Sequence, residues 1–336
     1  AVSFAYIGLN GASDAVLASN KIFTLVTVLA IYWAATFIAM KGIGWVGKIS
    51  KWGGLIGTII PAGLLIVLGI IYIATGGHNY MDMSQSFIPD LTKFDNLVLA
   101  SSIFLFYAGM EMMGVHVMDV NNPSRNYPKA IIIGSLATVC IFVLGTFALG
   151  VIIPAKDINL TQSLLIGFDN FFRYFHIPWA GPVIAVALML GVLASVLTWV
   201  AGPSKGIFTV GKAGYLPPFF QKSNSHGVQR NILLVQGGIV TLLSLLFVVM
   251  PSVQSFYQIL SQLTILLYLI MYMLMFAAAI TLRYKMKTAQ RPFRLGKGNA
   301  LMWILGVTGF CGSLLAFVLS FIPPGQINTG SSTVWY

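Results

Sequence analysis

Glu111 is the only glutamate in the chain, and it lies inside an apolar stretch, FLFYAGMEMMG at residues 104–114. A carboxylate at bilayer depth costs about 2.5–3.5 kcal/mol on insertion scales, so it is retained where it faces a partner, a cavity or a proton path. Glu111 is therefore the first candidate for a functional group. The alternative is a protonated carboxyl group that hydrogen-bonds to a neighbouring helix as a packing contact.

Two glycines, Gly109 and Gly114, flank this carboxylate. Glycine lowers the cost of breaking a helix. A broken helix exposes N–H and C=O groups that bind the charged ends of a zwitterion, and the dipoles of the half-helices add partial charge. We expect the helix to be interrupted near Ala108–Glu111, directly after Tyr107, and we expect these residues to bind an amino acid.

Two further pairs of polar or aromatic residues have helical spacing. Ser195 and Trp199 are four apart and share a helix face, as do Tyr268 and Tyr272. Trp199 fits either an aromatic lid over a substrate or an anchor at the membrane interface. The tyrosines either line the substrate path or donate to the backbone of a neighbouring helix. All four are candidate binding or gating residues.

The chain offers little other chemistry. His116 follows Glu111 by five residues and would titrate at acidic pH, so the two are candidates for pH sensing, although a lone histidine near a helix end also fits a packing role. No histidines have zinc spacing, and Cys140 and Cys311 are isolated in apolar runs. We expect no metal and no cofactor. An enzyme would need converging catalytic groups, and the apolar spans offer Glu111 and His116 at most.

The elements that position these residues are long apolar helices. The chain is 57% hydrophobic and 8% charged, whereas soluble domains carry roughly 25% charged residues. A helix needs about 20 apolar residues to cross a bilayer, and continuous helices satisfy their own backbone in lipid. We predict an all-α polytopic membrane protein, with residues 1–336 as one transmembrane domain. Eight spans are expected near 22–40, 53–76, 97–118, 129–153, 178–201, 231–250, 254–282 and 300–322.

Charge is distributed unevenly among the links between these spans. The links after the first, third, fifth and seventh spans hold 15 of the 19 Lys and Arg residues, and the opposite side carries six aspartates. Such a bias predicts that the basic links face the cytoplasm. It also explains the net charge of +11 without a nucleic acid partner. The expected partners are the lipid bilayer and a small amino acid substrate.

Two motifs resemble the amino acid–polyamine–organocation superfamily. YAGMEMMGVHVMDVNNPSRNYPKA at 107–130 is similar to its sixth helix and following loop, and TWVAGPSKGIFTVGKAGYLPPFF at 198–220 is similar to its eighth helix. The likeness is greatest to the bacterial glutamate:GABA antiporter family, and it extends through VIIPAKDINL at 151–160 and FIPPGQI at 321–327. The first motif rests on Gly109, Glu111, Asn122, Pro123, Arg125 and Pro128.

The resemblance implies a LeuT-type fold of twelve helices with a five-plus-five inverted repeat. This chain would be truncated at both ends, running from the end of helix three to helix eleven, without the first helices or the C-terminal plug of those antiporters. It would work in the bacterial inner membrane by alternating access, exchanging glutamate for GABA in acid resistance.

The resemblance also assigns roles to residues. Glu111 would be the carboxylate near the substrate, Trp199 the gate, and Tyr268 and Tyr272 the lining of the path. Those antiporters carry a glutamate where this chain has Ser195, and the loss of a carboxylate there is expected to change the preferred substrate charge or the pH response. The alternatives are a proton-coupled or exchange permease for another amino acid, a membrane-embedded enzyme, and a non-functional truncated fragment.

Overall fold

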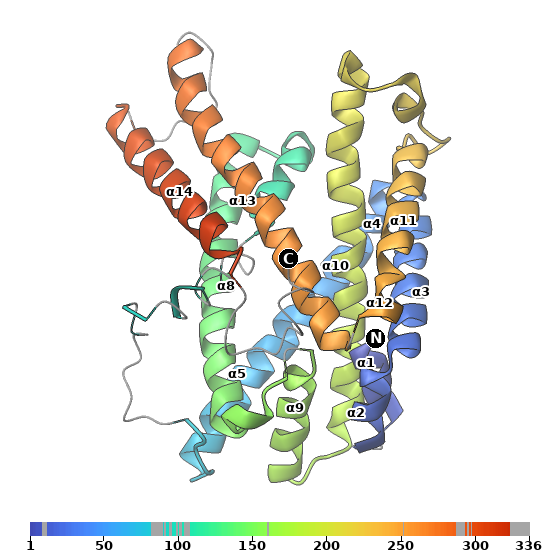
Figure 1. Cartoon of the computed structure of the whole chain (residues 1–336), viewed down its shortest axis with the longest axis vertical. Coiled ribbons are helices and arrows are strands. Elements are labelled where there is room, and N and C mark those ends of the chain that lie inside the picture. Colours follow the sequence, from blue (N-terminus) through green and yellow to red (C-terminus); the bar gives the residue numbers. More distant parts are fainter. Residues whose placement is uncertain are drawn as a thin grey trace. The chain divides into compact units, whose positions relative to one another are not determined.

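The computed structural model consists of helices and the segments that connect them (Figure 1), and no strand occurs in the parts of the chain it describes. Because lipid offers no hydrogen-bond partners, helices are the elements that such apolar segments form. The structure describes residues 1–322 apart from 9–11, 82–89, 91, 94–95, 99, 101–102, 104–107, 160, 251, 287–292, 294–295 and 297.

Six described segments are long and apolar enough to cross a membrane. They are α3 (Lys21–Ala39), α4 (Ile43–Gly54) continued by η2 (Leu55–Ile59) and α5 (Ile60–Ala74), α8 (Pro123–Ile152), α10 (Ala180–Val210) continued by η5 (Gly211–Tyr215), α13 (Val253–Lys285) and α14 (Ala300–Leu319). The shorter helices are α1 (Val2–Ala5), η1 (Tyr6–Gly8), α2 (Ala12–Ser19), η3 (Met110–Asp119), η4 (Ala155–Asp157), α9 (Ser163–Tyr174), η6 (Pro218–Gln221), α11 (Arg230–Ser244) and α12 (Leu246–Val249).

Two of the eight expected spans are not among the six long helices. The segment expected at 231–250 is divided into α11 and α12, and α11 has only 15 residues. The segment expected at 97–118 lies partly outside the described residues, and its described C-terminal half forms the 3₁₀ helix η3. Hydropathy alone does not register such interruptions, because broken and unbroken apolar segments have the same composition.

The chain divides into two compact units. Unit 1 contains Ala1–Met83, Met112–His116 and Val139–Phe256, and unit 2 contains Ser84–Glu111, Val117–Thr138 and Tyr257–Tyr336.

In unit 1, α10 is the central helix, and it contacts α3, α4, α9 and α11. Small residues let α4 and η2 approach α10 closely, and this contact of α4 and η2 with α10 is called here the α4–α10 contact. A Cβ on Gly57 of η2 would collide with the backbone of Gly191 of α10, so the two helix backbones touch there without side chains between them. Near the start of the contact, the hydroxyl oxygens of Ser50 and Thr198 are 2.8 Å apart.

A second part of unit 1 is held by aromatic packing. Phe168, Phe171 and Phe172 of α9 are fully buried, and Leu65 and Tyr72 of α5 are buried against them. Tyr72 meets Phe171 edge to face, with ring centroids 5.6 Å apart. This cluster fixes α9, an amphipathic helix too short to span a membrane, against the long helices.

In unit 2, α13 packs against α14. Leu269 and Ala316 are buried in the contact, and the side-chain amide of Gln262 donates to the backbone oxygen of Ser320 over 2.6 Å. A Cβ on Gly309 would collide with the ring of Phe276. The pair therefore depends on glycine, as the α4–α10 contact does.

Candidate functional site

The site in unit 2 begins with a left-handed turn directly before η3. Ala108 and Gly109 form a turn, and Gly109 has φ 105°, in the left-handed region that glycine alone enters freely. The 3₁₀ helix η3 starts at Met110, and Glu111 lies in its first turn. The first backbone N–H groups of η3 have no partner within that helix.

The two oxygens of the Glu111 carboxylate have different surroundings. Oε2 accepts a hydrogen bond from the backbone N–H of Gly109 over 3.2 Å and another from the hydroxyl of Tyr272 over 3.0 Å. Oε1 is buried and has no hydrogen-bond partner among the described residues. A buried acceptor without a donor is costly, so Oε1 is suited to accept from a group that arrives and leaves.

Three tyrosines surround this carboxylate. Tyr268 and Tyr272 lie one turn apart on α13, with ring centroids 5.8 Å apart, and Tyr268 is close enough to Glu111 to interact with it electrostatically. Tyr127, in the first turns of α8, does the same. Sequence reasoning missed Tyr127, although it lies in the quoted motif directly before Pro128. Its role depends on a contact between distant segments that spacing does not reveal.

Tyr272 also lines a cavity of about 570 Å³ in unit 2. The cavity lies where the small residues of α14, Gly309 and Gly312, face α13, and Thr308 and Ser313 supply hydroxyl groups to its wall. The sequence analysis did not identify these residues. The repeated small residues of α14 were the available signal, but glycine is common in membrane helices and gives little information alone.

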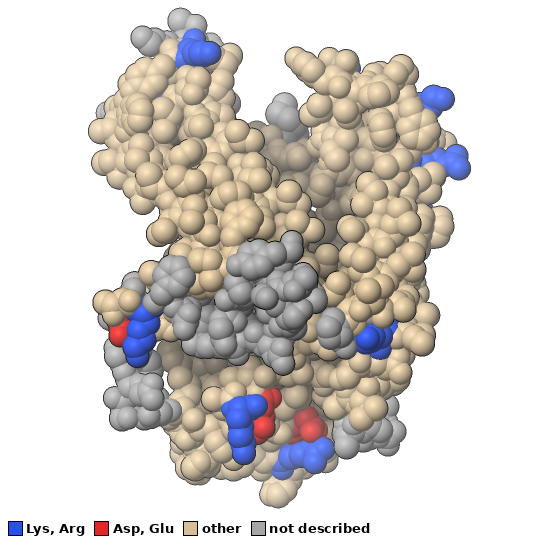
Figure 2. Space-filling view, viewed as in Figure 1, with Lys and Arg blue, Asp and Glu red and all other residues tan. Residues whose placement is uncertain are grey.

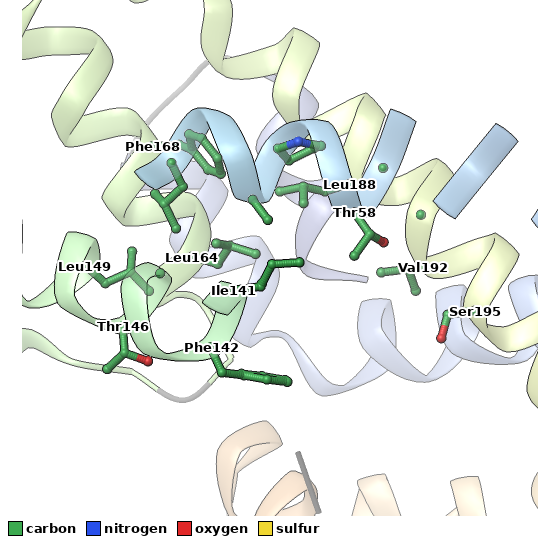
Figure 3. A pocket seen from close by; sticks show the side chains of 16 residues that line it. Thr58, Ile141, Phe142, Thr146, Leu149, Leu164, Phe168, Leu188, Val192 and Ser195 are labelled. Atoms are coloured by element: carbon green, nitrogen blue, oxygen red, sulfur yellow. The ribbon is translucent and has the colours of Figure 1, made fainter. Parts of the chain in front are cut away.

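Ser195 and Trp199 lie on α10 in unit 1. Ser195 is on the wall of a cavity of about 440 Å³, together with Thr58 and Thr146, and the other lining residues are apolar or glycine. Figure 3 shows the hydroxyl groups of Thr58 and Ser195 on the side of the cavity formed by α5, η2 and α10. Trp199, one turn further along, is 40% exposed. Their binding and gating roles stay predictions.

Two predicted site residues have no described side chain. Tyr107 lies outside the described residues, and His116 lies in η3 without a described side chain. Of the predicted residues, the structure brings Gly109, Glu111 and Tyr272 into direct contact. Tyr268 lies beside Tyr272, and Ala108 forms the turn before η3 together with Gly109. In the parts of the chain that are described, no cluster of three metal-ligating side chains occurs.

Apolar helices of membrane-spanning length define a polytopic membrane protein, and a partly buried carboxylate in the first turn of η3 is a group that such proteins keep at functional sites. The chain belongs to the amino acid permease family, within the amino acid–polyamine–organocation superfamily, because the family's model matches residues 1–336. The family and the relatives named below are transporters or antiporters and not enzymes. The predicted fold class, an all-α polytopic membrane protein of this superfamily, is confirmed.

Relatives from bacteria agree with this assignment. An uncharacterized transporter of Legionella pneumophila is 35% identical over 311 residues, covering 93% of this chain and 67% of the relative. A glutamate/gamma-aminobutyrate antiporter of Lactococcus lactis is 32% identical over 316 residues, covering 93% of this chain and 63% of the antiporter. The putrescine transporter PotE of Escherichia coli is 25% identical, covering 86% and 62%. The chain thus spans about two thirds of the length of the relatives it matches.

Proposed function

We propose that this protein exchanges glutamate for GABA by alternating access, with Glu111 as the group that binds the substrate ammonium. The observation that carries the proposal is the divided environment of the Glu111 carboxylate: Oε2 is held by Gly109 and Tyr272, while Oε1 is buried without a described partner. The identity of 32% to glutamate/gamma-aminobutyrate antiporters supports the substrate pair.

The ammonium group common to glutamate and GABA matches the unused oxygen. An ammonium group has three N–H donors, of which one satisfies Oε1 and two remain for other acceptors. A charge-assisted hydrogen bond of this kind is worth about 1.5–3 kcal/mol, more than a neutral one. Because the Oε2 contacts already fix the carboxylate, little side-chain freedom is lost when the substrate binds.

The substrate carboxylate needs donors of its own. The left-handed turn at Gly109 is followed by the first N–H groups of η3, and the start of a helix carries partial positive charge. We assign the α-carboxylate of glutamate to these groups. In this scheme Tyr268 lines the path beside Tyr272, Trp199 acts as the gate, and Glu111 and His116 are the groups that sense pH.

We further propose that the protein lies in the bacterial inner membrane with its basic links facing the cytoplasm. If internal GABA leaves as external glutamate enters, and glutamate is then decarboxylated inside, each cycle consumes one cytoplasmic proton. This stoichiometry would give the exchange a role in acid resistance.

A second candidate is exchange or proton-coupled uptake of a different amino acid, and Ser195 favours it. The likeness to the glutamate:GABA antiporter family places a glutamate at this position, whereas this chain has a hydroxyl group on the wall of an otherwise apolar cavity. A site with one carboxylate fewer is expected to hold a substrate with a different net charge.

Exchange in proteoliposomes separates these candidates. Purified protein would be reconstituted into vesicles loaded with GABA, arginine or a neutral amino acid, and uptake of labelled glutamate would be followed at pH 5 and pH 7. We expect uptake driven by internal GABA, stronger at pH 5, and at least tenfold lower in Glu111→Gln. Asp169→Asn is the matched control, because Asp169 is a half-buried carboxylate of unit 1 that is paired with Arg173 over 2.9 Å.

Uptake driven by another internal amino acid would keep the site and replace the substrate pair. Equal uptake by the wild-type protein and Glu111→Gln would contradict the role of Glu111. No exchange with any internal solute would contradict the proposed activity.

A further inference from the structure

We propose that the exposed face of α4 is a binding site for the headgroup of an anionic phospholipid. The site consists of Lys41, two residues before α4 begins, and of Trp45, Lys48, Lys51 and Trp52 on α4. These five residues, called here the α4 basic face, are all exposed. Neither the family nor the proposed exchange assigns a role to these residues.

The packing of α4 on α10 fixes which side of α4 is exposed. Val46 and Gly53 are buried on the side that meets α10, and a Cβ on Gly53 would collide with Ala194 and the backbone of Leu190. Ser50 adds its hydroxyl contact to Thr198. These contacts fix the orientation of α4 about its own axis, so the same side of α4 always faces away from α10.

On that opposite side, charge and aromatic rings alternate. Trp45, Lys48 and Trp52 have the spacing i, i+3, i+7, which places them on one helix face, and the tryptophans are 55% and 57% exposed. The Lys41 ammonium lies 5.6 Å from the Trp45 ring centroid, and Lys51 lies equally far from the ring of Trp52. These cation–π contacts hold two ammonium groups beside the rings.

The α4 basic face has no nearby source of negative charge in the sequence. Residues 15–81 contain no Asp or Glu, and neither do residues 170–336. The segment 202–230 carries further basic groups, and it meets the chain just before α4, where the side-chain amide of Asn224 donates to the backbone oxygen of Met40 over 2.8 Å. Figure 2 shows blue side chains and no red ones at the upper end of α10 and α11. Charge complementarity therefore calls for an anion.

An amphipathic anion fits better than a soluble one, because the charged face continues into an apolar one. Leu55, Ile56 and Ile59, the next residues along the exposed side, are 38%, 39% and 57% exposed. Tryptophan prefers the level of lipid headgroups, and lysine reaches from a helix end toward phosphates. A phospholipid places its phosphate at the lysines and its acyl chains along this apolar strip, which a free phosphate or a soluble protein does not.

Native mass spectrometry of the purified protein tests this inference with phosphatidylglycerol and phosphatidylcholine as probes. Each lysine near an anionic surface is worth about fivefold in affinity, so Lys48→Gln with Lys51→Gln should weaken phosphatidylglycerol binding by roughly thirtyfold. Phosphatidylcholine binding should not change. The matched control is Lys93→Gln with Lys156→Gln, which removes the same charge from exposed lysines outside the α4 basic face.

A second variant guards against misfolding. Lys48→Arg with Lys51→Arg keeps the charge and should retain phosphatidylglycerol binding. Unchanged binding in the glutamine pair, or an equal loss in the control pair, would overturn the proposal. Displacement of the lipid by millimolar inorganic phosphate, with phosphate retained at the α4 basic face, would show a soluble-anion site and would also overturn it. Lipid binding is measured without transport, so failure here leaves the proposed exchange untouched.

Discussion

The α4–α10 contact of unit 1 and the Glu111 site of unit 2 are built on opposite principles. In the α4–α10 contact, Gly57 and Gly191 have no side chains, so the two backbones touch. The second inserts a carboxylate into an apolar surrounding and fastens only one of its oxygens, through Gly109 and Tyr272. Both use glycine, but in unit 1 glycine supplies space and at Gly109 it supplies a left-handed conformation.

The difference shows where stability and function reside. Lipid is as apolar as the helices, so helix pairs in membranes depend on close van der Waals contact, and the α4–α10 contact should determine whether the protein folds. In the Glu111 site the buried acceptor Oε1 has no partner among the described residues, and an unpaired buried acceptor costs free energy. Substitutions in the first region should therefore change stability, and substitutions in the second should change transport.

The largest effect is expected from Gly57→Ala. The added methyl group would collide with backbone atoms of Ala187 and Gly191, which cannot rotate away as a side chain can. We expect a loss of about 3 kcal/mol or more of stability, measured as a lower midpoint of thermal unfolding in detergent. Gly54→Ala is the control, since no atom lies within 4 Å of its Cβ position. Equal midpoints for the two variants would contradict the close contact.

Tyr272→Phe should affect transport more than stability. It removes the hydroxyl that donates to Glu111 Oε2 over 3.0 Å, and hydrogen bonds to charged groups contribute about 1.5–3 kcal/mol. We expect kcat/KM for glutamate exchange to fall by roughly tenfold to a hundredfold, with little change in the unfolding midpoint. Tyr257→Phe, which alters an exposed tyrosine of the same helix, should leave both values unchanged. A stability loss without a transport loss would assign Tyr272 to packing.

Gly109→Ala tests the left-handed turn. A non-glycine residue at φ 105° is strained by about 1–3 kcal/mol, and relief of the strain would turn Glu111 away from Tyr272. We expect a several-fold rise in KM, measured as uptake against glutamate concentration. Gly134→Ala, at an open helical position of α8, should be neutral. If Gly109→Ala transports normally, the turn does not position the carboxylate.

The smallest effect is expected from Ser50→Ala. The Thr198 hydroxyl already donates to the backbone oxygen of Ala194 over 2.9 Å, so Ser50 is the donor in the contact between them. Its loss should cost about 0.5–1.5 kcal/mol of stability, with no change in exchange. A large change in exchange would show that the α4–α10 contact takes part in transport. It would contradict the division of stability and transport between this contact and the Glu111 site.

Composition predicted the helical membrane fold. Glu111 became a candidate functional residue because it is the one glutamate in the chain and lies in an apolar stretch. Helix ends were harder, because amphipathic extensions do not raise hydropathy: the span expected at 53–76 begins at Ile43, and its added turns contain Lys48 and Lys51. The sequence gives no sign that Tyr127 lies near Glu111 or that Ser195 lines an apolar cavity, since both facts depend on segments distant in the chain.

Arg283 illustrates the same limit for charged residues. The charge bias placed it among the basic residues of a solvated link, but it is only 6% exposed. Its guanidinium donates to the backbone oxygens of Gly296 and Gly298 over 3.2 and 2.8 Å. Its Nε donates to Asn299 Oδ1 over 3.3 Å. A buried guanidinium is tolerated when its donors are satisfied, and two of the acceptors here are backbone groups, which no side-chain pattern reveals.

The most direct test of the Glu111 site compares two ligands that differ only in the ammonium group. Isothermal titration calorimetry would measure the binding of glutamate and of glutarate, its analogue without an amino group, to the wild-type protein and to Glu111→Gln. If Oε1 binds the ammonium, the wild-type protein should prefer glutamate by about thirtyfold, or about 2 kcal/mol, and Glu111→Gln should bind both ligands almost equally. A variant that keeps the full preference for glutamate would contradict the assignment of Glu111 as the ammonium acceptor.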